Sequence, residues 1–68
     1  MEFKITSLDY IALNNLLKVL QLVETGGDAN TRIELGDVIV NGAVEKQKRK
    51  KIRAGDRVEF DNKTITVS

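Results

Sequence analysis

The sequence predicts an α+β domain in which two short helices pack on a small, mostly antiparallel twisted sheet. Leucines recur at helical spacing in the first third of the chain. From residue 37 onward, apolar and polar residues alternate, with the turn dipeptide Asn41-Gly42 between two such runs. The 68 residues suffice for one domain, which we expect to span residues 1–68. A chain of this length buries only about 60% of its unfolded surface, so we expect modest stability.

The first third should contain a short strand followed by a helix. Apolar and polar residues alternate over residues 3–6, which predicts a peripheral strand, and residues 7–9 then form a connection. We expect Tyr10, Ile11 and Val23 to close the two ends of the helix face. That face consists of residues at i, i+3, i+4 and i+7: Leu13, Leu16, Leu17 and Leu20.

A second, shorter helix should begin near Thr25. Thr25 is a suitable N-cap, and Asp28 three residues later forms a weak version of the capping box. Ala29 and Ile33 fall on one face, where the small Ala29 lets the two helices approach closely. Gly36 is well placed to end the helix in a left-handed conformation.

The remaining strands are predicted from the alternation of apolar and polar residues. Asn41-Gly42 predicts a type I′ hairpin turn, because both residues tolerate positive φ, and residues 43–45 return alongside residues 38–40. Residues 54–56 mark another turn. Residues 57–60 and 64–67 read as a final strand pair joined through residues 61–63.

Charge is distributed unevenly along the chain. Six of the eight residues from Lys46 to Arg53, here called the basic segment, are cationic, and the remainder of the chain is net −5. Concentrating one sign of charge favours attraction to a polyanion. A solvated loop is the plain alternative. The segment lies between two turn signals within the sheet, so we expect its cations to be presented rigidly. If four to six of them each neutralise a phosphate, the logarithm of the binding constant should fall with log[salt] at a slope of roughly −3 to −5.

The start of the second helix is a second candidate site. A helix N-terminus exposes unpaired N–H groups that suit a phosphate, and Gly26 and Gly27 have no Cβ to hold a ligand away. An ordinary N-cap explains the same residues, and Asp28 competes with an incoming anion.

Other chemistries are largely excluded. The chain contains neither Cys nor His, which removes disulfides, Cys/His zinc sites and His-based catalysis. The carboxylates are scattered and there is no GxxxxGK[ST] loop, so we expect no enzyme activity, no cofactor and no small-molecule substrate. No apolar run approaches about 18 residues and no signal peptide is evident, so we expect a cytoplasmic protein that spans no membrane.

Aromatic residues are few. We expect Phe3, Tyr10 and Phe60 to serve the core or strands, leaving no platform on which bases could stack. Any nucleic acid would then be held by its backbone charge and shape, as in structured RNA.

Several short motifs together resemble one known family. They are Val23-Glu24-Thr25-Gly26-Gly27-Asp28-Ala29, then Gly36-Asp37-Val38-Ile39-Val40-Asn41-Gly42, then Gly55-Asp56-Arg57-Val58. Over about residues 5–67 the chain resembles the αL RNA-binding module of ribosomal protein S-four type. It is most similar to the small stand-alone bacterial members, the YbcJ/YaaA-like proteins.

The resemblance implies an αL RNA-binding motif whose second helix and basic loop contact RNA. Ribosomal RNA or a ribosome-associated RNA is the implied partner, and we expect the chain to act as a monomer. Relatives often carry a basic residue at position 30, where this chain has Asn30, and a glycine near Gln21. The implied RNA-binding residues are Lys18, Thr25, Gly26, Gly27, Asn30, Arg32, Lys46, Lys48, Arg49, Lys50 and Lys51.

A non-catalytic RNA-binding protein is therefore the leading hypothesis. The alternative is a protein-interaction adaptor whose basic face docks on an acidic partner, and duplex DNA binding is a third reading. Steep salt dependence favours a nucleic acid, whereas a protein partner would co-purify after nuclease treatment.

Overall fold

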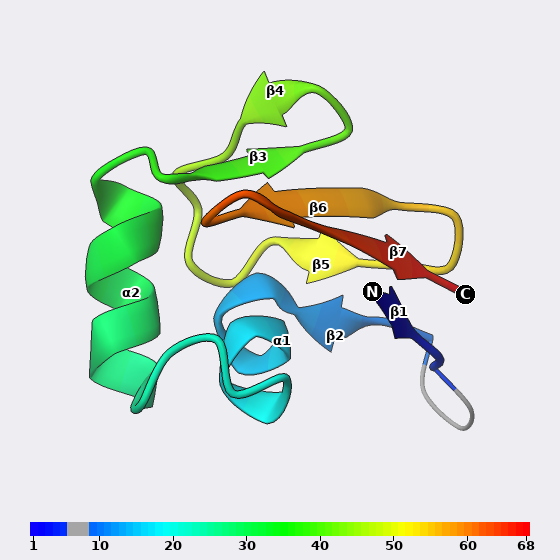
Figure 1. Cartoon of the computed structure of the whole chain (residues 1–68), viewed down its shortest axis with the longest axis horizontal. Helices are drawn as coiled ribbons and strands as arrows, with labels where there is room; N and C mark the ends of the chain where they lie inside the picture. Colours follow the sequence, from blue (N-terminus) through cyan, green and yellow to red (C-terminus); the bar gives the residue numbers. More distant parts are fainter. Residues whose placement is uncertain (6–8) are drawn as a thin grey trace.

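The computed structural model describes residues 1–5 and 9–68. Its main feature is a five-stranded sheet in which β1 and β7 run parallel and the other neighbours run antiparallel (Figure 1). This confirms the predicted α+β class. In spatial order the strands are β1 (Glu2–Phe3), β7 (Lys63–Val67), β6 (Arg57–Phe60), β3 (Val38–Val40) and β4 (Ala43–Val44).

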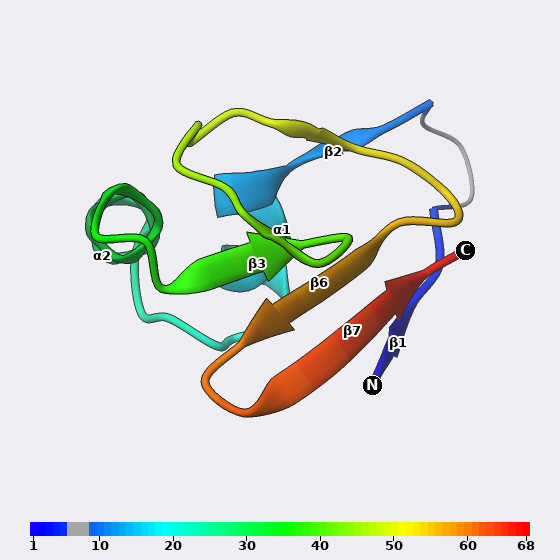
Figure 2. The ribbon, with the colours of Figure 1, turned by 90° about the horizontal axis from the view of Figure 1, so that it is seen from above.

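A two-stranded ribbon and two helices complete the fold. Figures 1 and 2 show α1 beside the ribbon and α2 beside one end of the main sheet. Neither helix of the described part of the chain has the length and apolarity that a membrane span requires. The ribbon pairs β2 (Ile11–Ala12) with β5 (Lys51–Ile52), and the helices are α1 (Leu13–Val19) and α2 (Gly26–Glu34).

The turns follow the predicted chemistry. Asn41 and Gly42 have φ of 50° and 85°, so the β3–β4 connection is the expected type I′ turn. Asp61 and Asn62 also have positive φ, and Lys63 already pairs with Phe60. The final hairpin therefore turns on two residues rather than the three predicted, because Asp and Asn tolerate the left-handed region.

The second helix begins and ends as predicted. The Thr25 side chain accepts a hydrogen bond from the Asp28 amide at 3.1 Å, which satisfies one otherwise unpaired N–H of the first turn. After α2, Gly36 has φ of 86°, the left-handed conformation expected of a helix-terminating glycine.

The first helix is shorter than predicted. Ile11 belongs to β2, Tyr10 precedes that strand, and Val23 is buried in the connection to α2, so the expectation that these residues extend the helix face was wrong. Ile11 pairs with Ile52 on β5, a strand that is distant in the sequence, and this pairing overrides the local helical pattern. The helix ends at Val19, and Gln21 follows with a φ of 59°.

The N-terminal strand is also shorter than predicted. β1 covers Glu2–Phe3, and the Ile5 amide bonds the Ser68 carbonyl at 2.7 Å, which extends contact with the C-terminal end of the chain. The remaining predictions for this region, a strand at Thr6 and a connection at Ser7 and Leu8, lie outside the described residues.

The core lies between the helices, the ribbon and one face of the main sheet. Ala29 is fully buried, which is consistent with the predicted close approach of α1 and α2. Alternate residues of β3, β6 and β7 supply the sheet side, as expected for strands with one buried face. The buried apolar set is Ile11, Leu13, Leu16, Leu17, Val23, Ala29, Ile33, Val38, Val40, Ile52, Val58, Phe60, Ile65 and Val67.

Candidate nucleic-acid interface

The basic segment is fixed to the body of the protein by its backbone. Ile52, within β5, is fully buried and pairs with Ile11 of β2. Part of the segment is thus a strand in a separate ribbon, rather than wholly the loop expected within the main sheet. The cations on either side of this anchor point are all exposed: Lys46, Lys48, Arg49, Lys50, Lys51 and Arg53.

The same segment caps the first helix. Ala12, the N-cap residue of α1, makes no side-chain capping bond. Instead, the amides of Leu13 and Asn14 donate to the carbonyls of Lys50 and Lys48 at 2.9 and 3.0 Å. Helix N–H groups that would otherwise need a cap or water are thereby satisfied. The backbone of the cationic residues is consequently held by bonds that helix α1 itself requires.

A side-chain contact connects this capped end of α1 to α2. Asn14 donates from Nδ2 to Oδ1 of Asn30 at 3.0 Å, in a partly buried position. Because the Asn14 amide also bonds Lys48, a single residue touches both candidate RNA-binding regions.

The glycines at the start of α2 are not demanded by the fold. Gly26 and Gly27 lie within the helix and are absent from the glycines with positive φ. A Cβ added at Gly26 would meet nothing within 4 Å, and one at Gly27 would lie 3.8 Å from the Thr25 hydroxyl. Glycine in a helix nevertheless costs up to about 1 kcal/mol relative to alanine. Their presence leaves space beside the exposed amides of the first turn.

Lys18 and Thr25 lie near the two ends of the connection that joins α1 to α2. Lys18 is exposed in the last turn of α1, where a cation suits the helix dipole. Thr25 is exposed, but its hydroxyl oxygen already accepts the Asp28 amide.

Arg32 is engaged in contacts with a different part of the fold. Its Nε donates to Oδ2 of Asp37 at 2.7 Å, and its guanidinium lies 4.9 Å from the centroid of the Phe60 ring. The hydrogen bond to Asp37 raises the pKa of Arg32 above its ordinary value. These contacts hold the Arg32 guanidinium against Asp37 and the Phe60 ring.

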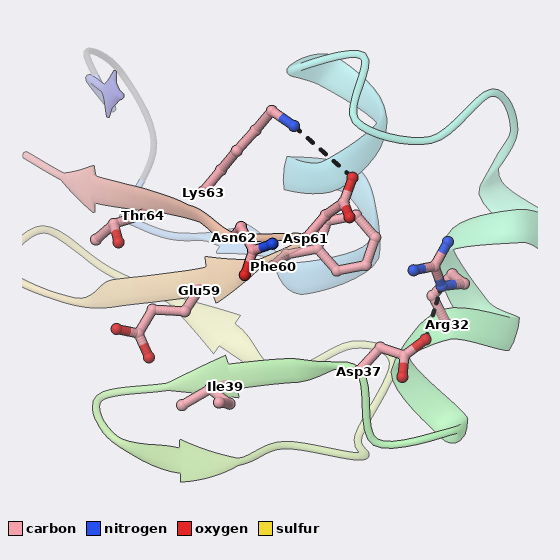
Figure 3. Close-up of a pocket in the computed structure, with 9 residues that line it drawn as sticks. All are labelled: Arg32, Asp37, Ile39, Glu59, Phe60, Asp61, Asn62, Lys63 and Thr64. Carbon is pink, nitrogen blue, oxygen red and sulfur yellow. Dashed lines mark hydrogen bonds and ion pairs between the residues drawn. The ribbon is translucent and has the colours of Figure 1, made fainter.

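The neighbourhood of Arg32 is rich in carboxylates. Figure 3 shows Arg32 pointing to Asp37 and Lys63 reaching toward Asp61, 3.7 Å away. Together with Glu59 these residues line a hollow of about 490 Å³. Its described lining includes no residue of the basic segment, so the hollow and the basic segment occupy separate places on the surface.

The structure also corrects the view that the aromatic residues leave no exposed ring. Phe60 is buried and Phe3 is partly buried, but Tyr10 is 41% exposed. Its ring centroid lies 5.1 Å from Nζ of Lys51 and 5.7 Å from Cζ of Arg53. Sequence reasoning missed this because it placed Tyr10 on the buried face of a helix.

Comparison with known proteins agrees with this architecture. Residues 3–68 match the model of the S4 domain family. The chain is 41% identical over 58 residues to "Putative RNA-binding protein YbcJ" of Escherichia coli (strain K12), covering 85% of this chain and 83% of the relative. It matches "Uncharacterized protein YbcJ" of Shigella flexneri to the same extent.

A solved structure extends the similarity to three dimensions. The solution structure of YbcJ from E. coli, described as revealing an αL motif involved in RNA binding, matches with a TM-score of 0.74. The two are 38% identical, over 97% of this chain and 84% of the other. The fold thus defines an αL module of two helices on a mixed sheet. The chain belongs to the S4 domain family.

Proposed function

We propose that this chain is a non-catalytic RNA-binding protein that recognises structured RNA through phosphate and shape contacts. One observation carries the proposal: six exposed cations stand on a segment whose backbone is fixed by Ile52 and by capping bonds to α1. Fixed cations bind a phosphate backbone without first losing backbone freedom. The relatives named or described for RNA binding support the same function.

The binding surface is proposed to be a cradle with two sides. Gly26 and Gly27, which the fold does not demand, leave room for a phosphate beside the first-turn amides of α2. Lys18 and Asn30 are proposed to flank that side. The basic segment forms the other side, through Lys46, Lys48, Arg49, Lys50 and Lys51. The bonds of Asn14 to Lys48 and Asn30 support placing both sides on one surface.

The partner is proposed to be ribosomal RNA or a ribosome-assembly precursor, bound in the cytoplasm by a monomer. The resemblance to a module of ribosomal proteins supports this choice of RNA. Binding through phosphates and shape also suits folded ribosomal RNA, which presents helical backbones.

A gel-shift titration with a structured RNA tests the proposal. The variant Lys48→Gln, Arg49→Gln, Lys50→Gln should lose most binding, and the slope of log K against log[salt] should become shallower by roughly 2–3. The matched control is Lys4→Gln, Arg57→Gln, Lys63→Gln, which has the same net charge and removes exposed cations outside the basic segment. The control should bind nearly as the wild type does.

Equal losses in the two variants would show that net charge alone governs binding and would overturn the proposed site. Tighter binding to a matched DNA hairpin than to the RNA hairpin would instead favour a DNA-binding role. Retention of a specific protein partner after nuclease treatment, without RNA binding, would favour the adaptor.

A further inference from the structure

The outward face of the β2–β5 ribbon carries an arrangement that phosphate binding alone does not require. Ile11 pairs with Ile52 and Ala12 with Lys51 in antiparallel register, and both isoleucines are buried. Side chains alternate between the two faces of a strand, so Tyr10, Lys51 and Arg53 share the exposed face. The ribbon therefore presents one aromatic ring close to two cations at its surface.

The distances between the Tyr10 ring and the two cations suit the binding of a nucleotide, which has both a base and a phosphate. Nζ of Lys51 and Cζ of Arg53 lie 5.1 and 5.7 Å from the centroid of the Tyr10 ring, within the range of cation–π attraction. Both cations are on long, exposed side chains, whereas the ring is attached beside a strand whose next residue, Ile11, is buried. The cations can move to phosphates while the ring keeps its place. An aromatic ring flanked by cations is the usual combination for stacking a base and binding its backbone.

This group is continuous with the basic segment. Lys51 and Arg53 belong to that segment, and the carbonyl of the preceding Lys50 bonds the amide of Leu13. A backbone bound along the segment would therefore reach Tyr10. Fully paired RNA keeps its bases stacked inside the helix, so only an unpaired base can reach the ring.

We propose that Tyr10 stacks an unpaired base of the bound RNA, with Lys51 and Arg53 binding the adjoining phosphates. The inference rests on the proposed function and narrows its substrate to structured RNA that contains a bulged or looped-out nucleotide. It replaces the expectation that the chain recognises only the backbone charge and the shape of the RNA.

Three RNA hairpins of equal length test this inference. One is fully paired, one carries a single bulged adenosine, and one carries an abasic site at the bulge. The wild type should bind the adenosine bulge about tenfold more tightly than the abasic bulge, the order of effect expected from one base–aromatic stack. Tyr10 is the only tyrosine and the chain has no tryptophan, so its fluorescence reports directly on the ring. The adenosine bulge should quench that fluorescence, and the abasic bulge should not.

Two substitutions complete the test. Tyr10→Leu should bind the adenosine and abasic bulges equally while still binding RNA, and Tyr10→Phe should keep the preference, because the hydroxyl is not needed for stacking. Circular dichroism of both variants checks the fold. A Tyr10→Leu variant that keeps the wild-type preference overturns this inference, as does equal wild-type binding of the adenosine and abasic bulges. Neither result affects the proposed function. Failure of the wild type to bind any hairpin overturns both proposals.

Discussion

Asn14 of α1 and Asn30 of α2 are joined by a side-chain hydrogen bond of 3.0 Å, and the main chain of Asn14 is bonded to Lys48. This pair connects the helix that should present amides to RNA with the segment that should present cations. The side chain of Asn30 thus serves a contact within the fold. The connection between the helices and the basic segment therefore depends in part on an uncharged residue.

Replacing Asn14 by Ala should destabilise the fold and weaken RNA binding. The substitution removes a partly buried hydrogen bond, worth about 0.5–1.5 kcal/mol, and leaves Oδ1 of Asn30 without this donor. Chemical denaturation measures the loss. Asn15→Ala, at the exposed neighbouring position of the same helix, is the matched control for helix propensity. A variant at Asn14 that is no less stable than the one at Asn15 would contradict the structural role of the contact.

Replacing Gly26 and Gly27 by Ala should affect stability and binding in opposite directions. Alanine favours a helix, and the space around both positions accepts a Cβ, so the fold should gain about 0.5 kcal/mol per site. The added methyl groups should hold a phosphate away from the first-turn amides and weaken RNA binding severalfold. Thermal unfolding and gel-shift titration of the double variant provide the two measurements. Unchanged affinity in the stabilised variant would exclude this helix start from the interface.

Replacing Gln21 by Gly should stabilise the protein. Gln21 has φ of 59°, a left-handed conformation that costs a residue with a Cβ about 1–2 kcal/mol and costs glycine little. The greater freedom of glycine in the unfolded chain offsets part of this gain, leaving about 0.5 kcal/mol and a rise in Tm of about 2–4 °C. Gln21→Ala keeps the strain and should change Tm by less. A lower Tm for the glycine variant would contradict the prediction. It would show that the Gln21 side chain contributes more to stability than its left-handed backbone conformation costs.

Stability should fall at acidic pH partly through Asp56. The Arg53 amide, 2.8 Å from the Asp56 carboxylate, and then the side chain of Asn41 lower the pKa of Asp56 in the folded protein. The charged form is favoured by folding, so this contribution is complete above the unfolded pKa of about 3.9 and is lost as the pH falls through the lower folded value. Asp56→Asn should therefore be less stable at neutral pH and depend less on pH below about 4. Urea unfolding at several pH values checks this, and parallel pH profiles for both proteins would contradict it.

The predictable parts of this protein were those set by local chemistry. The capping of α2 by Thr25, the left-handed Gly36 and the Asn41-Gly42 turn each depend on residues close in sequence. The start of α1 depends instead on pairing between Ile11 and Ile52, about forty residues apart, which no local period reveals. That distant pairing also decides the exposure of Tyr10. The contact of Arg32, a candidate site residue, with the Phe60 ring was not predicted for a similar reason, because Phe60 lies on a strand that is distant in the sequence.

The central claim is that the first turn of α2 and the basic segment form one RNA-binding surface, and amide chemical shifts during RNA titration test it most directly. A ¹⁵N-labelled sample titrated with a structured RNA hairpin should show the largest shift changes at Gly26, Gly27 and the amides of residues 46–53. The amides of Asp61 and Asn62, which line the hollow beside Arg32, should change little. Changes confined to the basic segment, with Gly26 and Gly27 unaffected at saturation, would contradict the two-sided surface.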